Sequence, residues 1–257
     1  MEPISTSGQT APVNDMEMFY ETRGEGEPLV LLHGGGGVGV NWELIFKATP
    51  QGYRLIAPDL RGHGRSTNPS AELTFRQSAR DVLGLLDHLG IERFKAIGLS
   101  FGAKTLLHIA TAEPSRVEAM VLVSATPYFP EQARSIMRQL TPENRSDEEW
   151  QQMRQWHKHG DEQIRKLWTQ MNALKDSYDD MNFTPPYLST IEARTLIVHG
   201  DRDPLYPVSL ATEMYAAIPR SYLWIVPNGG HGPIFGDLAA RFVETSLTFL
   251  RGEWESR

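Results

Sequence analysis

The sequence predicts an α/β domain whose central sheet is mostly parallel and is covered by helices on both faces. Short apolar runs rich in β-forming residues recur along the chain between Gly, Pro or Asp residues, as is typical of buried parallel strands. Amphipathic helical patterns alternate with these runs, and this alternation indicates strands joined by crossover helices. The length of 257 residues agrees with one large domain, or with one domain that carries an insertion.

Six segments have the pattern of a buried strand, and all are too short to be buried helices. They are residues 28–33, 53–59, 93–99, 117–124, 194–199 and 221–226. Between and after them, apolar residues at steps of three and four predict amphipathic helices. These helices cover residues 75–86, 105–110 and 238–249, and Gly90 ends the first of them.

The alternation stops between residues 127 and 190, where no strand candidate occurs. Segments 131–140, 147–159 and 161–175 are amphipathic, and we interpret 127–190 as a helical cap inserted into a core made of 16–126 and 191–257. Residues 1–15 are interpreted as a flexible polar lead-in. The cap contains large apolar side chains. If they line a pocket, they favour an apolar or aromatic substrate. Packing of the cap helices against each other and against the sheet would account for each of these side chains equally well. These side chains are Tyr128, Phe129, Met137, Trp150, Met153, Trp156, Trp168 and Met171.

Composition excludes several classes of function. The chain has no cysteine, which removes disulfides, thiolate nucleophiles, zinc–thiolate sites and iron–sulfur clusters. Lys and Arg number 25 against 32 Asp and Glu, and a net charge of −7 does not favour nucleic-acid binding.

No apolar run approaches about 18 residues, and the first residues do not resemble a secretory signal. We therefore expect a cytoplasmic protein with no membrane span and a small-molecule substrate, and we leave the oligomeric state open.

The strongest local signal is Gly-Leu-Ser-Phe-Gly at residues 98–102, which matches G-x-S-x-G. A predicted strand precedes it and a predicted helix follows it. The two glycines allow a sharp turn that presents the Ser100 hydroxyl above the edge of the sheet. A glycine and serine turn without chemistry is the alternative, and the strand–turn–helix context argues against it. Ser100 is therefore the predicted nucleophile.

A serine nucleophile needs a base and a group that orients the base. His-Gly-Asp-Arg-Asp-Pro follows the fifth predicted strand at 199–204, and Asn-Gly-Gly-His-Gly follows the sixth at 228–232. We assign His231 as general base and acid and Asp203 as the carboxylate that holds its tautomer, in the order Ser, Asp, His that suits a serine on a strand-to-helix turn. Asp201 competes with Asp203, and we interpret it as a turn-forming residue.

The glycine-rich loop His-Gly-Gly-Gly-Gly at 33–37 follows the first predicted strand. Glycines there let backbone N–H groups approach a substrate closely. We assign the oxyanion hole to the backbone N–H groups of Gly35 and Phe101, with Gly36 as the alternative donor in the loop. A phosphate-binding loop is the weaker interpretation, because neither G-x-G-x-x-G nor G-K-[ST] is present.

With these motifs in order, the chain resembles the α/β-hydrolase superfamily over residues 18–250. The nearest resemblance is to small esterases, lactonases and cofactor-free haloperoxidase-like members. The motif Asp-Leu-Arg-Gly-His-Gly-Arg-Ser at 59–66 belongs to the pattern, and the resemblance implies that Asp59, Arg61 and His63 shape a turn. Leu99 stands where many relatives have His. Ser100 differs from the Asp of haloalkane dehalogenases and epoxide hydrolases. Lipases with an H-G-G-G loop typically carry an acidic residue before the serine and lack the motif at 59–66, so the chain is not placed among them.

Other polar residues are weaker candidates. His157 and His159 look like a metal pair, but residues two apart on a helix point to different sides, so we interpret them as part of a solvated face. We expect Lys104, His108 and His88 to have ordinary surface or helix-end roles.

The sequence thus predicts a carboxylesterase-like serine hydrolase of a small ester or lactone, acting through an acyl-enzyme without a cofactor or metal. A C–C bond hydrolase or a lyase on the same residues is one alternative. A ligand receptor that keeps the pocket without turnover is another, and perhydrolysis is a conceivable side reaction.

Overall fold

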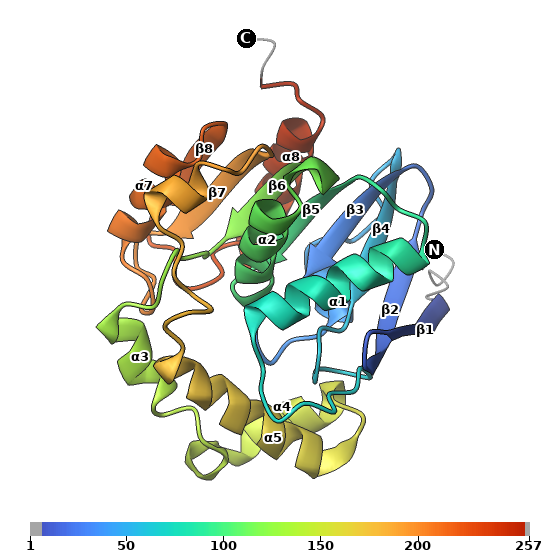
Figure 1. Cartoon of the computed structure of the whole chain (residues 1–257), viewed down its shortest axis with the longest axis vertical. Helices are drawn as coiled ribbons and strands as arrows, with labels where there is room; N and C mark the ends of the chain where they lie inside the picture. Colours follow the sequence, from blue (N-terminus) through green and yellow to red (C-terminus); the bar gives the residue numbers. More distant parts are fainter. Residues whose placement is uncertain (1–6, 255–257) are drawn as a thin grey trace.

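The structure is a computed structural model that describes residues 7–254. Within these residues a single sheet has the strand order β1-β2-β4-β3-β5-β6-β7-β8 (Figure 1). Strands β1 and β2 are antiparallel to their neighbours, and the remaining pairs are parallel, so the predicted α/β class with a mostly parallel sheet is confirmed. The strands are β1 (Ser7–Val13), β2 (Met16–Arg23), β3 (Glu27–Leu32), β4 (Tyr53–Pro58), β5 (Phe94–Leu99), β6 (Val117–Val123), β7 (Arg194–Gly200) and β8 (Ser221–Val226).

Strands β3 to β8 correspond to the six predicted segments, whereas β1 and β2 were not predicted. The interpretation of residues 1–15 as a polar lead-in is wrong for Ser7–Val13, which pairs with β2 at the edge of the sheet. Ala11 and Val13 are buried on either side of Pro12, but the strand begins with Ser-Gly-Gln-Thr, so the apolar alternation is too short to recognise from sequence. Residues 1–6 lie outside the described part of the chain.

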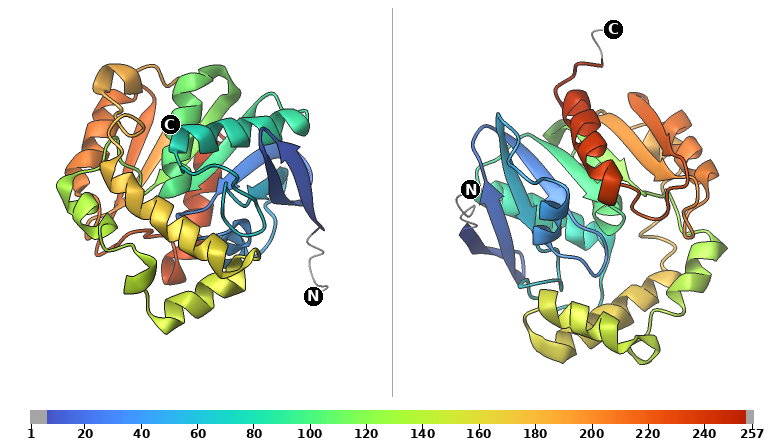
Figure 2. Two further views of the ribbon diagram at one scale, coloured as in Figure 1. Left: turned by 60° about the horizontal axis from the view of Figure 1, so that its bottom comes forward. Right: turned by 180° about the vertical axis from the view of Figure 1, so that it is seen from behind.

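Helices cover both faces of the sheet. On one face lie α1 (Phe75–His88), α2 (Phe101–Ala112) and α7 (Val208–Ala217), and on the other lie α8 (Ala239–Leu250) and the 3-10 helix η1 (Gly39–Leu44) (Figures 1 and 2). Strand β3 shows why both faces must be covered, because Leu29 and Leu31 enter one apolar core while Val30 and Leu32 enter the other. Two short 3-10 helices, η2 (Pro114–Arg116) and η5 (Gly236–Leu238), join these elements.

Between β6 and β7 the chain forms a series of helices that lies below the sheet in Figure 1 and across its end in Figure 2. All three predicted helical stretches contain a helix, and each helix ends earlier than predicted. Helix α4 has the capping box of Ser146 and Glu149 at its start. The elements are α3 (Glu131–Met137), η3 (Pro142–Asn144), α4 (Asp147–Trp156), α5 (Gly160–Ala173), η4 (Leu174–Asp176) and α6 (Pro185–Leu188). We call residues 127–190 the helical segment.

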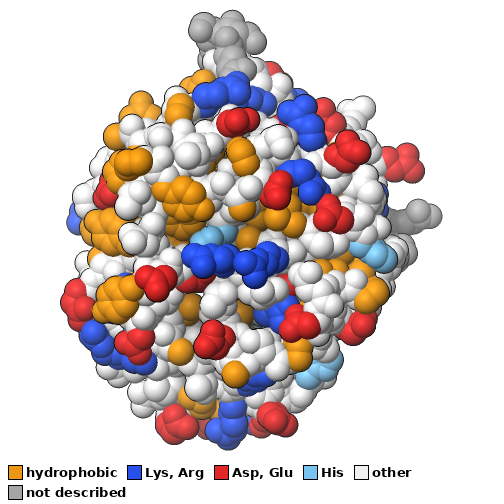
Figure 3. Space-filling model, in the orientation of Figure 1, with side chains coloured by type: hydrophobic (Ala, Val, Ile, Leu, Met, Phe, Trp, Pro, Cys, Tyr) orange, Lys and Arg blue, Asp and Glu red, His pale blue; other side chains and the backbone are white. Residues whose placement is uncertain are grey.

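The surface carries charges of both signs. Acidic and basic side chains are interspersed over the face in Figure 3, as expected for a chain with 25 basic and 32 acidic residues. Among residues 7–254, no helix has the length and apolar character that crossing a bilayer requires.

Candidate active site

Ser100 lies on a sharp turn between β5 and α2. Its backbone has φ 49° and ψ −100°, a conformation that is strained for a residue with a side chain. The flanking glycines make the turn possible, because a Cβ on Gly98 would lie 2.6 Å from the Gly102 backbone, and one on Gly102 would lie 2.2 Å from the Leu32 carbonyl oxygen. The Ser100 N–H donates to the carbonyl oxygen of Val123, 2.8 Å away, which ties the turn to β6.

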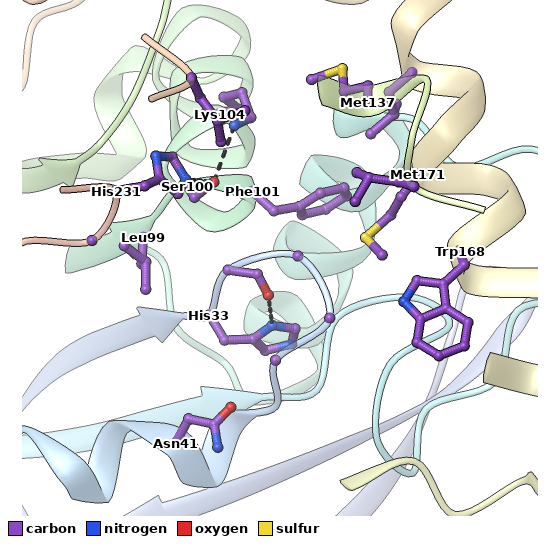
Figure 4. A pocket seen from close by; sticks show the side chains of 18 of the residues that line it. His33, Asn41, Leu99, Ser100, Phe101, Lys104, Met137, Trp168, Met171 and His231 are labelled. Carbon is purple, nitrogen blue, oxygen red and sulfur yellow. Dashed lines mark hydrogen bonds between the residues drawn. The ribbon is translucent and has the colours of Figure 1, made fainter. Parts of the chain in front are cut away.

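The structure brings Ser100, His231 and Asp203 together from the loops after β5, β8 and β7. Ser100 Oγ and His231 Nε2 are 2.8 Å apart (Figure 4), and His231 Nδ1 is 2.8 Å from Asp203 Oδ2. A series of hydroxyl, imidazole and carboxylate with this geometry can activate a serine, because the imidazole can take the hydroxyl proton while the carboxylate holds the ring. The His231 side chain is 24% exposed, so it borders open space.

Asp203 is buried, whereas its competitor Asp201 is exposed. Asp203 Oδ1 accepts hydrogen bonds from the backbone N–H groups of Leu205 and Tyr206, at 2.8 and 3.2 Å. Burial raises the pKa of the Asp203 carboxyl, but the hydrogen bond and charge of His231 and these two N–H groups outweigh burial and leave the pKa below its ordinary value. The geometry therefore favours Asp203 over Asp201 as the partner of His231.

The loop at residues 33–37, which we call the oxyanion loop after its predicted role, lies beside the start of α2. The Gly102 N–H donates to the His33 carbonyl oxygen at 3.0 Å, and a Cβ on Gly35 would lie 3.9 Å from Phe101 Cβ. Of the two loop glycines considered from the sequence, Gly36 donates its N–H to His63 Nε2 at 3.1 Å. That bond occupies Gly36, so the geometry favours Gly35 and Phe101 as the pair of oxyanion donors.

Three buried histidines hold this loop. His33 Nε2 accepts the N–H of Leu60 at 2.9 Å, and the rings of His33 and His63 meet edge to face with centroids 4.9 Å apart. His157 Nδ1 accepts the N–H of Gly64 at 2.7 Å, and its Nε2 lies 3.2 Å from the Gly36 carbonyl oxygen. Burial lowers the pKa of His33 and of His157 to about 4 and that of His63 well below its ordinary value. The three imidazole rings are therefore neutral at pH 7, and each forms hydrogen bonds with backbone groups of the loop or of its neighbours.

The interpretation of His157 and His159 as a solvated face is wrong for His157. Helix α4 ends at Trp156, and His157 turns inward and is only 2% exposed, whereas His159 is exposed. The two residues do not share a helix face because both lie in the turn between α4 and α5. Among the described residues, no group of three or more His, Asp or Glu side chains is arranged to hold a metal ion.

A cavity of about 570 Å³ opens at Ser100 and His231, between the sheet and the helical segment. Its wall is mostly apolar, and the helical segment supplies many of the larger side chains. Trp150 is not among them, since it packs edge-on against Trp168, and Tyr128 is 39% exposed at the surface. The large apolar lining residues from the helical segment are Phe129, Met137, Leu140, Met153, Trp156, Trp168, Met171 and Leu174.

Lys104 also lines this cavity, a position that was not predicted from the sequence. The expectation of a surface or helix-end role is wrong, because Lys104 is only 3% exposed. Its Nζ lies 3.4 Å from Ser100 Oγ (Figure 4) and 3.0 Å from Tyr206 Oη. The spacing offered a signal: a residue four positions after Ser100 on a helix lies one turn away on the same side. His108 is also buried and bonds to the Asp180 carbonyl oxygen at 2.7 Å, while His88 is exposed.

Comparison with known proteins agrees with this fold. The family model for the alpha/beta hydrolase fold matches residues 27–148. The 2-hydroxy-6-oxo-6-(2'-aminophenyl)hexa-2,4-dienoic acid hydrolase of Metapseudomonas resinovorans is 23% identical, covering 97% of this chain and 94% of that protein. The serine hydrolase BPHL of Mus musculus is 27% identical, covering 96% and 90%. The crystal structure of the enol-lactonase from Burkholderia xenovorans LB400 superposes with a TM-score of 0.77 at 23% identity, covering 95% and 100%.

The fold and these comparisons define a protein of the hydrolase class. The chain has the α/β-hydrolase fold, and the family model for that fold matches residues 27–148.

Proposed function

We propose that this protein is a serine hydrolase that cleaves a small carboxylic ester or lactone through an acyl-enzyme. The observation that carries the proposal is the continuous hydrogen-bonded series from Ser100 Oγ through His231 to Asp203, with both links at 2.8 Å. A serine hydroxyl reacts at neutral pH only when a base removes its proton, and this series supplies that base in position. The resemblance to an enol-lactonase in fold is compatible with the proposal.

The reaction would proceed in two stages. His231 Nε2 takes the Ser100 proton as Oγ attacks the carbonyl carbon, and the carbonyl oxygen becomes an oxyanion between the N–H groups of Gly35 and Phe101. His231 then passes the proton to the departing alkoxide, and an ester to Ser100 remains. In the second stage His231 takes a proton from water, the hydroxide attacks the acyl carbon, and Ser100 recovers its proton as the acid leaves. Asp203 stabilises the imidazolium in both stages.

The cavity sets the class of substrate. Its volume of about 570 Å³ falls in the range of small-molecule sites, and its wall is mainly Met, Trp, Phe and Leu. Such a wall favours an apolar acyl or alcohol group by removing its surface from water. We therefore expect a small ester or lactone with an apolar part directed toward the helical segment.

A second candidate is hydrolysis of a carbon–carbon bond on the same residues. The Metapseudomonas resinovorans relative, which matches nearly the whole chain, is named for an oxo-dienoic acid. Such an acid has no ester, so its hydrolysis breaks a bond between carbon atoms. The same serine, base and oxyanion donors would serve that reaction if the attacked carbonyl were a ketone.

The test combines labelling with a substrate panel. A fluorophosphonate should label Ser100, as read by peptide mass, and the panel should contain 4-nitrophenyl esters of graded acyl length, γ- and δ-lactones, and a 2-hydroxy-6-oxo-dienoate. We expect ester or lactone turnover with a maximum at short to medium chains. Turnover of the dienoate alone would replace the proposal with the second candidate, and labelling without turnover of any member, together with tight ligand binding, would favour a receptor.

A further inference from the structure

Lys104 is a buried cation beside the nucleophile that the proposed mechanism does not use. Its side chain emerges from the first turn of α2, and its ammonium group lies 3.4 Å from Ser100 Oγ. Within residues 7–254, no carboxylate approaches its Nζ to ion-pair distance. A buried charge without a partner is costly, so a lysine in this place is best explained by a partner that arrives with the substrate.

The surroundings of the ammonium group are aromatic on several sides and open on one. The rings of Tyr206, Phe75 and Phe129 have centroids 4.9, 5.5 and 5.6 Å from Lys104 Nζ. These ring faces attract the cation without neutralising it. The remaining side is the cavity, and Lys104 is the only Lys or Arg among the described residues that line it.

Tyr206 supplies a second donor next to the ammonium group. Its Oη is 3.0 Å from Lys104 Nζ and accepts a hydrogen bond from it, which leaves the phenolic O–H free to donate to a ligand. Tyr206 is buried, and burial together with the charge of Asp203 raises its pKa, so the phenol keeps its proton. One cationic and one neutral donor thus border the same part of the cavity.

We propose that Lys104 and Tyr206 bind a carboxylate group of the substrate, so that the preferred substrate is an acidic ester or lactone with the carboxylate close to the scissile carbonyl. The reach of the ammonium group sets this position. Because Nζ is 3.4 Å from Ser100 Oγ and an ammonium-to-carboxylate contact spans about 2.8 Å, the carboxylate belongs near the carbon that Oγ attacks. The apolar part of the substrate would then lie against the Met and Trp side chains of the helical segment.

The proposal deepens the proposed function and rests on it, so the test must separate the two. Monomethyl malonate and methyl 3-methylbutanoate form a matched pair, because an isopropyl group replaces the carboxylate in the second ester. Hydrolysis of each is followed in a pH-stat, and the ratio of the two kcat/KM values measures selectivity for the carboxylate. In Lys104→Met we expect this ratio to fall about ten- to hundredfold through a higher KM for monomethyl malonate.

Two further variants make the result specific. Lys104→Arg keeps the charge and should retain part of the selectivity, and Tyr206→Phe should lower it less than Lys104→Met does. Lys47→Met is the matched control, since Lys47 is exposed and does not line the cavity. Thermal unfolding monitored by circular dichroism checks that each variant is folded.

The outcomes are distinguishable. If Lys104→Met lowers kcat/KM for both esters by the same factor, or if the wild type prefers the neutral ester, the carboxylate site is wrong while the serine hydrolase stands. If neither ester is hydrolysed, the measurement is whether each ester protects Ser100 from labelling by the fluorophosphonate. Protection by monomethyl malonate that is lost in Lys104→Met supports the carboxylate site, and equal protection by both esters contradicts it.

The pH dependence gives an additional check. Burial lowers the pKa of Lys104 to about 7, with the charge of Asp203 acting in the opposite direction. The amine therefore loses its charge as pH rises through this value, and the KM of the wild type for monomethyl malonate should rise between pH 6 and 9. Asp203, His231 and Tyr206 face the same group, so the rise is measured against Lys104→Met, in which it should be absent.

Discussion

The candidate site contains two kinds of histidine, which differ in their hydrogen-bond partners. His231 is partly exposed and connects a serine hydroxyl to a carboxylate. His33, His63 and His157 are buried and form hydrogen bonds with backbone groups of the oxyanion loop and its neighbours. The comparison teaches that the partner of a histidine, rather than its proximity to the nucleophile, decides whether it can move a proton or only holds a loop in place.

The largest expected effect on the rate comes from changing the group that exchanges a proton with His231. Ser100→Ala should lower kcat/KM for a short 4-nitrophenyl ester by about four orders of magnitude or more, because the attacking oxygen is gone. Ser189→Ala, on an exposed serine, is the control and should leave the rate unchanged. Undiminished turnover by a folded Ser100→Ala protein would sink the assignment of the nucleophile.

The carboxylate that distinguishes His231 from the other histidines should matter nearly as much. Asp203→Asn should lower kcat about 10³- to 10⁴-fold, because an amide in place of the carboxylate favours the wrong imidazole tautomer and cannot stabilise the imidazolium. Asp201→Asn is the matched control two residues away, and we expect less than about a twofold change. The reverse order of effects would assign the role to Asp201.

A smaller effect on the rate is expected from changing a buried histidine that bonds to the oxyanion loop. His157→Ala removes the bonds to Gly36 and Gly64, so the oxyanion loop should be less well placed, with a fall in kcat of about ten- to hundredfold and a smaller change in KM. His157→Gln should recover part of the rate, because an amide can still donate and accept. His159→Ala is the control, and equal losses in the two alanine variants would remove the distinction between these residues.

The smallest effect concerns stability. The pKa of His157 is about 4 in the folded protein, below its value of about 6.5 in the unfolded chain. As pH falls from 6.5 toward 4, the unfolded state therefore binds a proton that the folded state does not, and stability is lost at up to about 1.4 kcal/mol per pH unit. Urea unfolding from pH 7 to 4.5 should show a shallower loss in His157→Gln than in the wild type. Equal slopes would show that His157 is not held neutral by the fold.

Much of the fold and the core of the candidate site could be predicted from sequence because the signals are local. Six strands have short apolar runs, and Ser100 stands between glycines that only a tight strand-to-helix turn requires. His231 and Asp203 follow neighbouring strands of a parallel sheet, whose carboxyl ends meet at one edge. Strand β1 was missed because its alternation is weak and its pairing is with β2 alone, at the edge.

The sequence by itself determined the class of fold and indicated the candidate nucleophile and its two candidate partners, since periodicity and turn chemistry act over a few neighbouring positions. Only the tertiary structure decided the surroundings of Lys104 and His157. Lys104 meets Tyr206 across 102 positions of the chain, and His157 meets Gly36 across 121. Whether such side chains are buried, neutral or aimed at the cavity depends on elements far away in sequence, because burial and hydrogen-bond partners are set by packing between them.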